Sequence, residues 1–172
     1  MLVKMNRQEF DLLDDDALGW MCMEPIFLQI RGKDMAVKSQ AFAQLGTGQQ
    51  ALFMFRVLYD HARNSVTEFY CWVAYLLEQS YFWSGVMKGL RFFDDALMIQ
   101  ILEETKNVLE TRSQQIGLQL SNVNFKDLED NRELKSTIDR LFQKFQEATP
   151  DSLKRISVYI RSNPLEFVEM KD

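Results

Sequence analysis

The spacing of apolar residues along the chain predicts helices and gives no convincing strand. Apolar positions recur every three or four residues in the two clearest segments, 97–109 and 134–145. This period places them on one face of a helix, with charged and polar residues on the other face. In the second segment the apolar stripe consists of Leu134, Ile138, Leu141, Phe142 and Phe145.

Capping residues mark where several of these helices begin. Asn6, with Glu9 three residues later, has the spacing of a capping box, and Ser65 with Glu68 has the same spacing. Asp95 can cap the helix that follows it, because a carboxylate is favourable at the positive end of a helix. These caps predict helix starts near residues 7, 66 and 96.

Other residues predict where helices end. Pro25 should break or kink the first helix, and Ser84-Gly85 with Gly89 predict a break around 80–84. The segment 117–125 has no clear period and is the best candidate for a loop. Near the C-terminus, Thr149 is expected to cap a separate last helix, with Pro150 at its first position.

The predicted elements amount to about seven helices, which indicates an all-α fold in one compact helical domain over residues 1–172. Seven glycines and three prolines are few for a fold that depends on many turns. The loop at 117–125 is the one place where the chain could divide, into a helical core at 1–116 and a C-terminal helical pair at 126–172.

The stretch EFYCWVAYLLEQSYFW, residues 68–83, holds seven aromatic residues in sixteen positions. Its longest apolar run, Phe69 to Leu77, has nine residues, whereas a membrane-spanning helix needs about 20. A central core helix is the simplest interpretation. Seven aromatic residues exceed what one core stripe needs, so part of the stretch is also expected to face a partner. The residues predicted for that contact are Phe69, Tyr70, Trp72, Tyr81 and Trp83.

The charge balance argues against direct binding to nucleic acid. The chain has 20 Lys and Arg against 25 Asp and Glu, which gives a net charge of −5. Nucleic-acid binding draws on clustered cations that neutralise several phosphates. The basic runs here are short and are balanced by nearby acids, so no nucleic-acid partner is expected.

The N-terminal residues and the cysteines indicate a cytoplasmic protein without a membrane partner. The segment MLVKMNRQEFDLLDDD is acidic where a signal peptide would have its apolar core. Cys22 and Cys71 each lie among apolar residues and do not form a C-x-x-C pair, so we expect both to be free, buried thiols.

No residue pattern predicts catalysis, a cofactor or a metal site. The chain has no phosphate-binding loop, nucleophile elbow or dinucleotide fingerprint. His61 is the single histidine, and its place near the end of a helix is explained by the helix dipole. Glu103, Glu104 and Glu110 lack the Glu-x-x-His partner of a helical carboxylate metal site. A surface for a basic partner at the acidic cluster 14–16 stays open.

Two further segments resemble a known family. LGTGQQALFMFRVLYDHARNSVTEFY, followed by GVMKGLRFFDDALMIQILEETKNVL, is similar to a bacterial domain of unknown function whose family includes a DNA-mimic protein. Phe69-Tyr70 matches the closing aromatic pair of the family's Asn-Gly-Gly-Phe-x-Gln-Phe-Phe motif, and Leu90-Arg91 lies in register with the helix pair that follows. Asn64-Ser65 replaces the glycine pair. The resemblance implies a compact helical domain.

The expected function is that of a non-enzymatic, cytosolic bacterial domain that binds a protein partner in a regulatory or immunity-type role. Two alternatives stay open. One is a small-ligand binder or enzyme with a pocket under the aromatic helix. The other is a DNA-mimic inhibitor of a DNA-binding protein, which the resemblance implies but which a modest acidic excess does not itself predict. The oligomeric state is left open.

Overall fold

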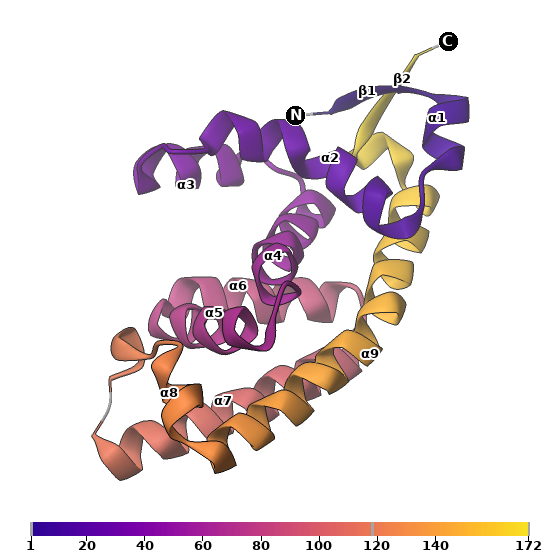
Figure 1. The fold of residues 1–172 in the computed structure, drawn as a ribbon. Helices are drawn as coiled ribbons and strands as arrows, with labels where there is room; N and C mark the ends of the chain where they lie inside the picture. The colour runs from indigo at the N-terminus through magenta and orange to yellow at the C-terminus, as the bar shows by residue number, and fades with distance from the viewer. Residues whose placement is uncertain (1, 118, 172) are drawn as a thin grey trace.

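The helices predicted from apolar spacing make up nearly all of the regular backbone (Figure 1). The computed structural model describes residues 2–117 and 119–171, and over those residues it has nine helices, seven of which have seven residues or more. The all-α fold in a single compact helical domain is therefore confirmed. In chain order the elements are β1 (Val3–Asn6), α1 (Arg7–Leu12), α2 (Asp15–Ile30), α3 (Met35–Ala43), α4 (Thr47–Ala62), α5 (Val66–Glu78), α6 (Ser80–Phe92), α7 (Ala96–Ile116), η1 (Leu120–Asn122), α8 (Lys126–Asp130), α9 (Arg132–Ser162), η2 (Pro164–Glu166) and β2 (Val168–Lys171).

The helix caps predicted at Asn6, Ser65 and Asp95 are present. The side chains of Asn6 and Ser65 accept hydrogen bonds from the backbone N–H groups of Glu9 and Glu68, at 2.8 and 3.1 Å. Asp95 caps α7 in the same way. Each bond satisfies one of the backbone donors that the first turn of a helix leaves without a partner.

Helix α4 lies at the centre of the fold, and α2, α5 and α6 pack around it (Figure 1). Its close approach to α6 depends on Gly89, where an added Cβ would lie 2.8 Å from the carbonyl oxygen of Ala51. The core-facing side of this helix is buried, with Leu52, Phe55 and Ala62 at or below 1% exposure. The tight contact fixes the position of α6 and therefore of the aromatic residues that α6 carries.

The two ends of the chain meet in a parallel strand pair that the sequence did not predict. Strand β1 pairs with β2 in the register Val3 opposite Val168, and the inward-facing side chains of Met5 and Val168 are buried. Each strand has only four residues, and its partner lies at the opposite end of the chain. A strand this short carries too few alternations for a period-2 pattern, and its pairing is not a local property.

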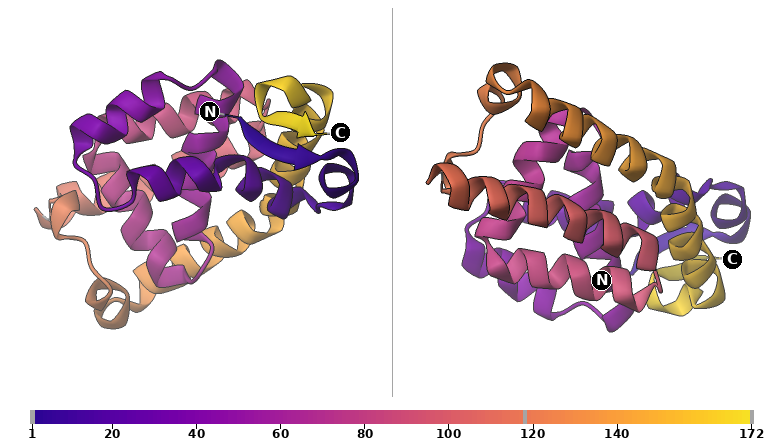
Figure 2. Two further views of the ribbon diagram at one scale, coloured as in Figure 1. Left: turned by 90° about the horizontal axis from the view of Figure 1, so that it is seen from above. Right: turned by 90° about the horizontal axis from the view of Figure 1, so that it is seen from below.

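Helix α9 spans the molecule and packs against α7, α5 and α2, and Figure 2 shows α7 and α9 side by side from below. The prediction that Thr149 and Pro150 begin a new helix is wrong, because α9 continues through both. The hydroxyl of Thr149 donates back to the carbonyl of Phe145. Proline removes the bond to the carbonyl of Gln146, but Gln146 is exposed, so water can satisfy that group. The axis of α9 changes direction in this part of Figure 1.

Two other predicted boundaries are displaced. Pro25 lies inside α2, which continues to Ile30 because buried residues on both sides of the proline hold it against the core. The break expected around 80–84 falls instead at Gln79, and Ser84 and Gly85 lie within α6. In both cases tertiary packing overrides the local preference.

Candidate functional site

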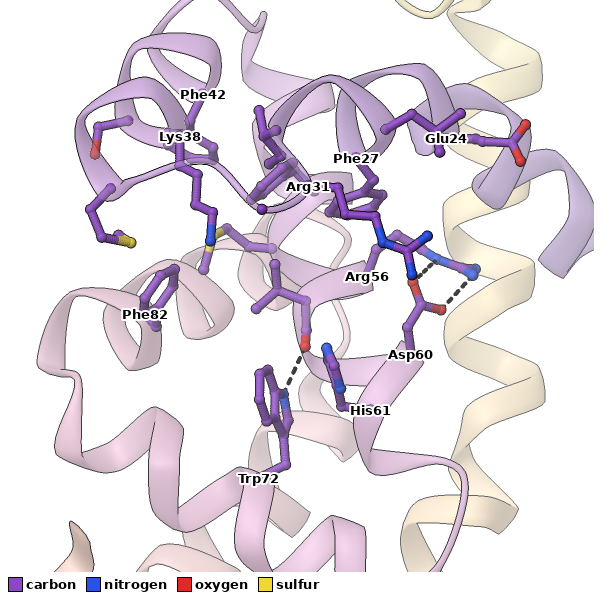
Figure 3. Close-up of a pocket in the computed structure, with 18 of the residues that line it drawn as sticks. Glu24, Phe27, Arg31, Lys38, Phe42, Arg56, Asp60, His61, Trp72 and Phe82 are labelled. Carbon is purple, nitrogen blue, oxygen red and sulfur yellow. Dashed lines mark hydrogen bonds and ion pairs between the residues drawn. The ribbon is translucent and has the colours of Figure 1, made fainter.

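A cavity with a volume of about 640 Å³ lies between α2, α3, α4 and the α5–α6 pair (Figure 3). Most of its lining is apolar, and eight of the lining residues are aromatic: Trp20, Phe27, Phe42, Phe53, Trp72, Tyr75, Tyr81 and Phe82. Aromatic-lined hollows with a few polar groups are typical of binding sites.

One wall is a chain of aromatic rings from α2, α3 and α4. The ring of Phe27 stacks between those of Trp20 and Phe53, with centroids 6.0 and 4.9 Å away, and Phe42 meets Phe53 edge-on at 5.3 Å. These pairs fix the rings against one another, since stacked and edge-to-face contacts add to the energy of burial. The wall is therefore largely preformed.

The opposite wall comes from α5 and α6, with His61 from the end of α4. The rings of His61 and Trp72 stack with centroids 3.8 Å apart, and Trp72 in turn stacks on Tyr75 at 4.9 Å. The indole N–H of Trp72 donates to the carbonyl of Val57 at 2.7 Å, a bond that Figure 3 shows. This bond holds the indole in one orientation at the cavity surface.

The rim of the cavity is apolar as well as the walls. Four of the lining residues are large apolar or aromatic residues with much of their surface exposed: Leu28 (62%), Met35 (50%), Tyr75 (43%) and Tyr81 (60%). Exposed apolar residues scattered singly need no explanation, whereas a contiguous set around a hollow marks an interaction site.

A second cavity of about 270 Å³ continues the first along α4 and α6. The two share Phe42, Met54 and Tyr81 in their linings, and the second extends past Gly85 and Gly89. We call the two cavities together the aromatic groove. Because they share lining residues, one extended occupant can fill both.

Helix α3 forms one side of the aromatic groove without burying any of its own residues. It packs mainly on α2, and Figure 1 shows it projecting at the side of the molecule away from α9. The side-chain amide of Gln50 donates to the carbonyls of Phe42 and Leu45, which holds the C-terminal end of α3 on α4. The inner face of α3 is left open toward the groove.

The arginine at the base of the groove, Arg56, forms its ion pairs with residues of the protein itself. The side chain of Arg56 is 3% exposed and forms ion pairs with Asp16 and Asp60, while its guanidinium lies 5.2 Å from the ring centre of Trp20. Burial raises the pKa of Asp60, and the charge of Arg56 opposes that rise. Breaking this network would leave a buried charge unpaired, so its role is to join α2 to α4.

Three other cations line the aromatic groove. Arg31 and Lys38 border the larger cavity and Lys88 the smaller one. Within residues 2–117 and 119–171, none of the three has an ion-pair partner. Their charges therefore face the groove and solvent.

The structure divides the five residues predicted for partner contact. Trp72 and Tyr81 line the groove. Phe69 and Tyr70 do not, because both are 0% exposed and are covered by other parts of the fold. Their prediction as surface residues is wrong: a helix that is apolar on all sides must bury one side, and the sequence does not say which. Trp83 is half-buried beneath Lys106, outside the groove lining.

The buried pair has clear structural partners. The ring of Phe69 lies 5.2 Å from that of Phe145, and the hydroxyl of Tyr70 donates to the carboxylate of Asp127. Burial, followed by the charge of Asp127, raises the pKa of Tyr70. These contacts join α5 to α9 and α8, so the residues stabilise the fold.

Sequence reasoning missed the wall contributed by α2. Trp20, Glu24, Phe27 and Arg31 are spaced by four, three and four residues, so they share one face of a helix. The prediction that Pro25 breaks or kinks the helix hid this spacing, because it divided the face in two. Read across the proline, the spacing would have predicted an aromatic face.

The other residues with candidate chemistry have structural roles. The carboxylate of Glu104 pairs with Lys144 at 2.7 Å, and in the described part of the chain no three His, Cys, Asp or Glu residues are grouped to hold a metal ion. Both cysteines are free thiols; Cys22 is buried, which raises its pKa to about 12, and Cys71 is half-buried. None of the described helices is both long enough and apolar enough to cross a bilayer.

No protein-family model, curated protein or solved structure matches the chain. The function is therefore inferred from the aromatic groove alone.

Proposed function

We propose that this protein is a non-enzymatic binding protein that takes an apolar segment of a partner protein into the aromatic groove. The observation that carries the proposal is the exposed apolar rim, formed by Leu28, Met35, Tyr75 and Tyr81. Leaving these side chains in water is unfavourable by roughly 25 cal/mol for each Å² of apolar surface. An occupant that covers them recovers that free energy on binding.

The shape of the groove favours an extended occupant over a compact one. The lining residues Phe42, Met54 and Tyr81 are common to both cavities, which places the cavities side by side. A segment of polypeptide can place one apolar side chain in each cavity and cover the rim between them, as in recognition of a helix or strand by a groove. Aromatic residues at the centre of such a surface are the usual anchors of binding energy.

The arrangement of polar groups supports binding without catalysis. The ring of His61 is stacked on Trp72, and among the described residues no side-chain hydrogen bond joins it to a hydroxyl or thiol of the groove lining. A nucleophile with an adjacent base is the signature of covalent catalysis.

The second candidate function is binding of a small apolar molecule. It is favoured by the volume of the larger cavity, about 640 Å³, which lies within the range of roughly 300–1,000 Å³ typical of small-molecule sites. A ligand confined to the larger cavity would leave the smaller cavity empty. The proposal of a protein segment accounts for both cavities.

A selection from a random peptide library displayed on phage tests the proposed function. The purified protein is the bait, and selected peptides are then measured against Met35→Asp and Tyr81→Asp. Both residues lie in the first turn of a helix, where an added carboxylate is tolerated, and both are at least half exposed. Leu97→Asp is the matched control, since Leu97 is 52% exposed in the first turn of α7, away from the groove.

We expect the two groove variants to lose the selected peptides and Leu97→Asp to retain them. Peptides that bind all three variants equally would contradict the proposal. Failure to enrich peptides, together with an organic molecule found by native mass spectrometry, would favour the second candidate. A dimer that Met35→Asp dissociates would show that the occupant is a second copy of the chain.

A further inference from the structure

The cations of the aromatic groove have a distribution that the fold itself does not require. Arg31, Lys38 and Lys88 come from three different elements, the end of α2, α3 and α6, and all of them border the groove. Glu24 is the one lining carboxylate with no ion pair among the described residues, since Asp60 is held by Arg56. The groove thus has three free cations against one free carboxylate, in a protein of net charge −5.

Helix electrostatics explain only one of the three cations. Arg31 caps the C-terminal end of α2, where a positive charge is favoured by the helix dipole. Lys38 lies near the N-terminal end of α3, where the dipole disfavours a positive charge. Figure 3 shows its side chain extending from α3 across the groove toward the side on which Phe82 lies. Lys88 lies in the second half of α6 and is exposed.

We infer that the segment bound in the aromatic groove is acidic, with Asp or Glu side chains flanking its apolar anchors so that they meet Lys38 and Lys88. This inference rests on the proposed function and specifies the chemistry of the partner. Apolar side chains of the segment fill the two cavities, and its carboxylates accept charge-assisted hydrogen bonds from the lysines at the edge. Complementary charges around an apolar centre chiefly determine partner choice and the rate of association.

The peptide selection described above also tests this inference, with charge-reversal variants added. Lys38→Glu and Lys88→Glu change the sign of the two groove lysines, and Arg132→Glu is the matched control. Arg132 is an exposed cation at the start of α9, with no ion pair among the residues that the structure describes. Circular dichroism and thermal unfolding establish that each variant is folded.

We expect the wild-type protein to select peptides in which Asp or Glu lies beside apolar residues. Lys38→Glu and Lys88→Glu together should weaken these peptides by about tenfold or more, with a steeper loss at low salt. Peptides with the acids replaced by Lys should regain binding to the double variant, a recovery that a merely structural role of the lysines would not produce. Arg132→Glu should change neither result.

The two proposals fail in different ways. Peptides that lose binding on Met35→Asp but carry no excess of acids, or that bind the double variant as tightly as the wild type, would overturn the acidic segment and leave the proposed function intact. Peptides that are insensitive to Met35→Asp and Tyr81→Asp would overturn both. Selection of basic peptides would overturn the acidic segment and point to Glu24 as the contact.

Discussion

Helices α9 and α3 lie on opposite sides of the central helix α4, and they differ in how they are held (Figure 1). Helix α9 buries nine residues along one continuous face and packs on α2, α5 and α7. Helix α3 buries none and packs mainly on α2. The apolar stripe of α9 is covered by the core, whereas the apolar residues of α3 lie beside an open groove.

The difference between α9 and α3 shows which apolar surface the fold leaves uncovered. Apolar surface that neighbours already cover contributes to folding and is not available to a partner. Met35 and Phe42 of α3 keep exposed surface next to the groove, so they remain available. Helix α3 therefore carries uncovered apolar surface on which the proposed binding depends.

Truncating the core of α9 is the strongest test of the contrast. Phe145 is 1% exposed, and its ring packs against Phe69. We expect Phe145→Ala to lower the free energy of unfolding by about 3–5 kcal/mol, as for other buried aromatic residues. Chemical denaturation measures this change.

The matching change in α3 is Phe42→Ala, at a half-buried ring that meets Phe53 edge-on. It should cost less than half as much stability, because solvent already reaches part of the ring. Equal losses for the two variants would mean that α3 is as much a part of the core as α9, and the contrast would fail.

The contact between α4 and α6 should be nearly as sensitive. A Cβ at position 89 would lie 2.8 Å from the carbonyl oxygen of Ala51, closer than ordinary packing allows, and backbone cannot move aside easily. Gly89→Ala is therefore expected to destabilise the protein by about 1–3 kcal/mol, although alanine is the better helix former. Ser84→Ala, at an exposed position of α6, is the control and should be close to neutral. A more stable Gly89→Ala protein would show that α6 can shift outward freely.

Helix caps provide a matched pair that compares α3 with α9 directly. Asp34 and Asn131 each accept a hydrogen bond of 2.9 Å from the backbone of the first turn. Removing such a cap costs about 1 kcal/mol. Asp34→Ala should speed amide hydrogen exchange within α3 and leave global unfolding nearly unchanged, because α3 can open on its own.

Asn131→Ala should instead lower global stability, since α9 opens only when the core opens. Hydrogen exchange followed residue by residue, together with chemical denaturation, separates the two patterns. If Asp34→Ala lowered global stability as much as Asn131→Ala, α3 would unfold only with the rest of the domain.

The same contrast explains how much of the fold could be predicted from the sequence. The stripe of Leu134, Ile138, Leu141, Phe142 and Phe145 is a local pattern that predicted this part of α9, and all of its members but the half-buried Phe142 are buried. Caps such as Ser65 are local as well. The strand pair was missed because it joins the two ends of the chain.

The groove could be predicted only in part, because it is assembled from five helices. Trp72 and Tyr81 were identified by the density of aromatic residues around them. Phe69 and Tyr70 shared that density but contact α9 and α8 respectively, which follows from how α5 packs and not from its composition. Phe42 and Phe53 come from separate helices and meet only in the folded protein. Composition therefore located the region, whereas packing determined which rings face the groove.

The smallest expected effect concerns the ion pair between α7 and α9. The carboxylate of Glu104 lies 2.7 Å from the ammonium of Lys144, and hydrogen bonds from Lys144 and Gln100 lower the pKa of Glu104. Because the pKa of Glu104 is lower in the folded state, the ion pair adds stability above the unfolded-state pKa of about 4.3. That stability is lost as pH falls through the folded-state pKa.

Both side chains are more than a third exposed, so Glu104→Gln should lower the unfolding free energy near neutral pH by less than about 1 kcal/mol. Denaturation curves of wild type and variant should converge in acid, once pH falls below the folded-state pKa of Glu104. Glu129→Gln, at an exposed carboxylate with no ion pair among the described residues, should have no effect at neutral or acid pH. A loss above about 2 kcal/mol, or one that persists in acid, would mean that α9 depends on this charge pair and not mainly on its buried face.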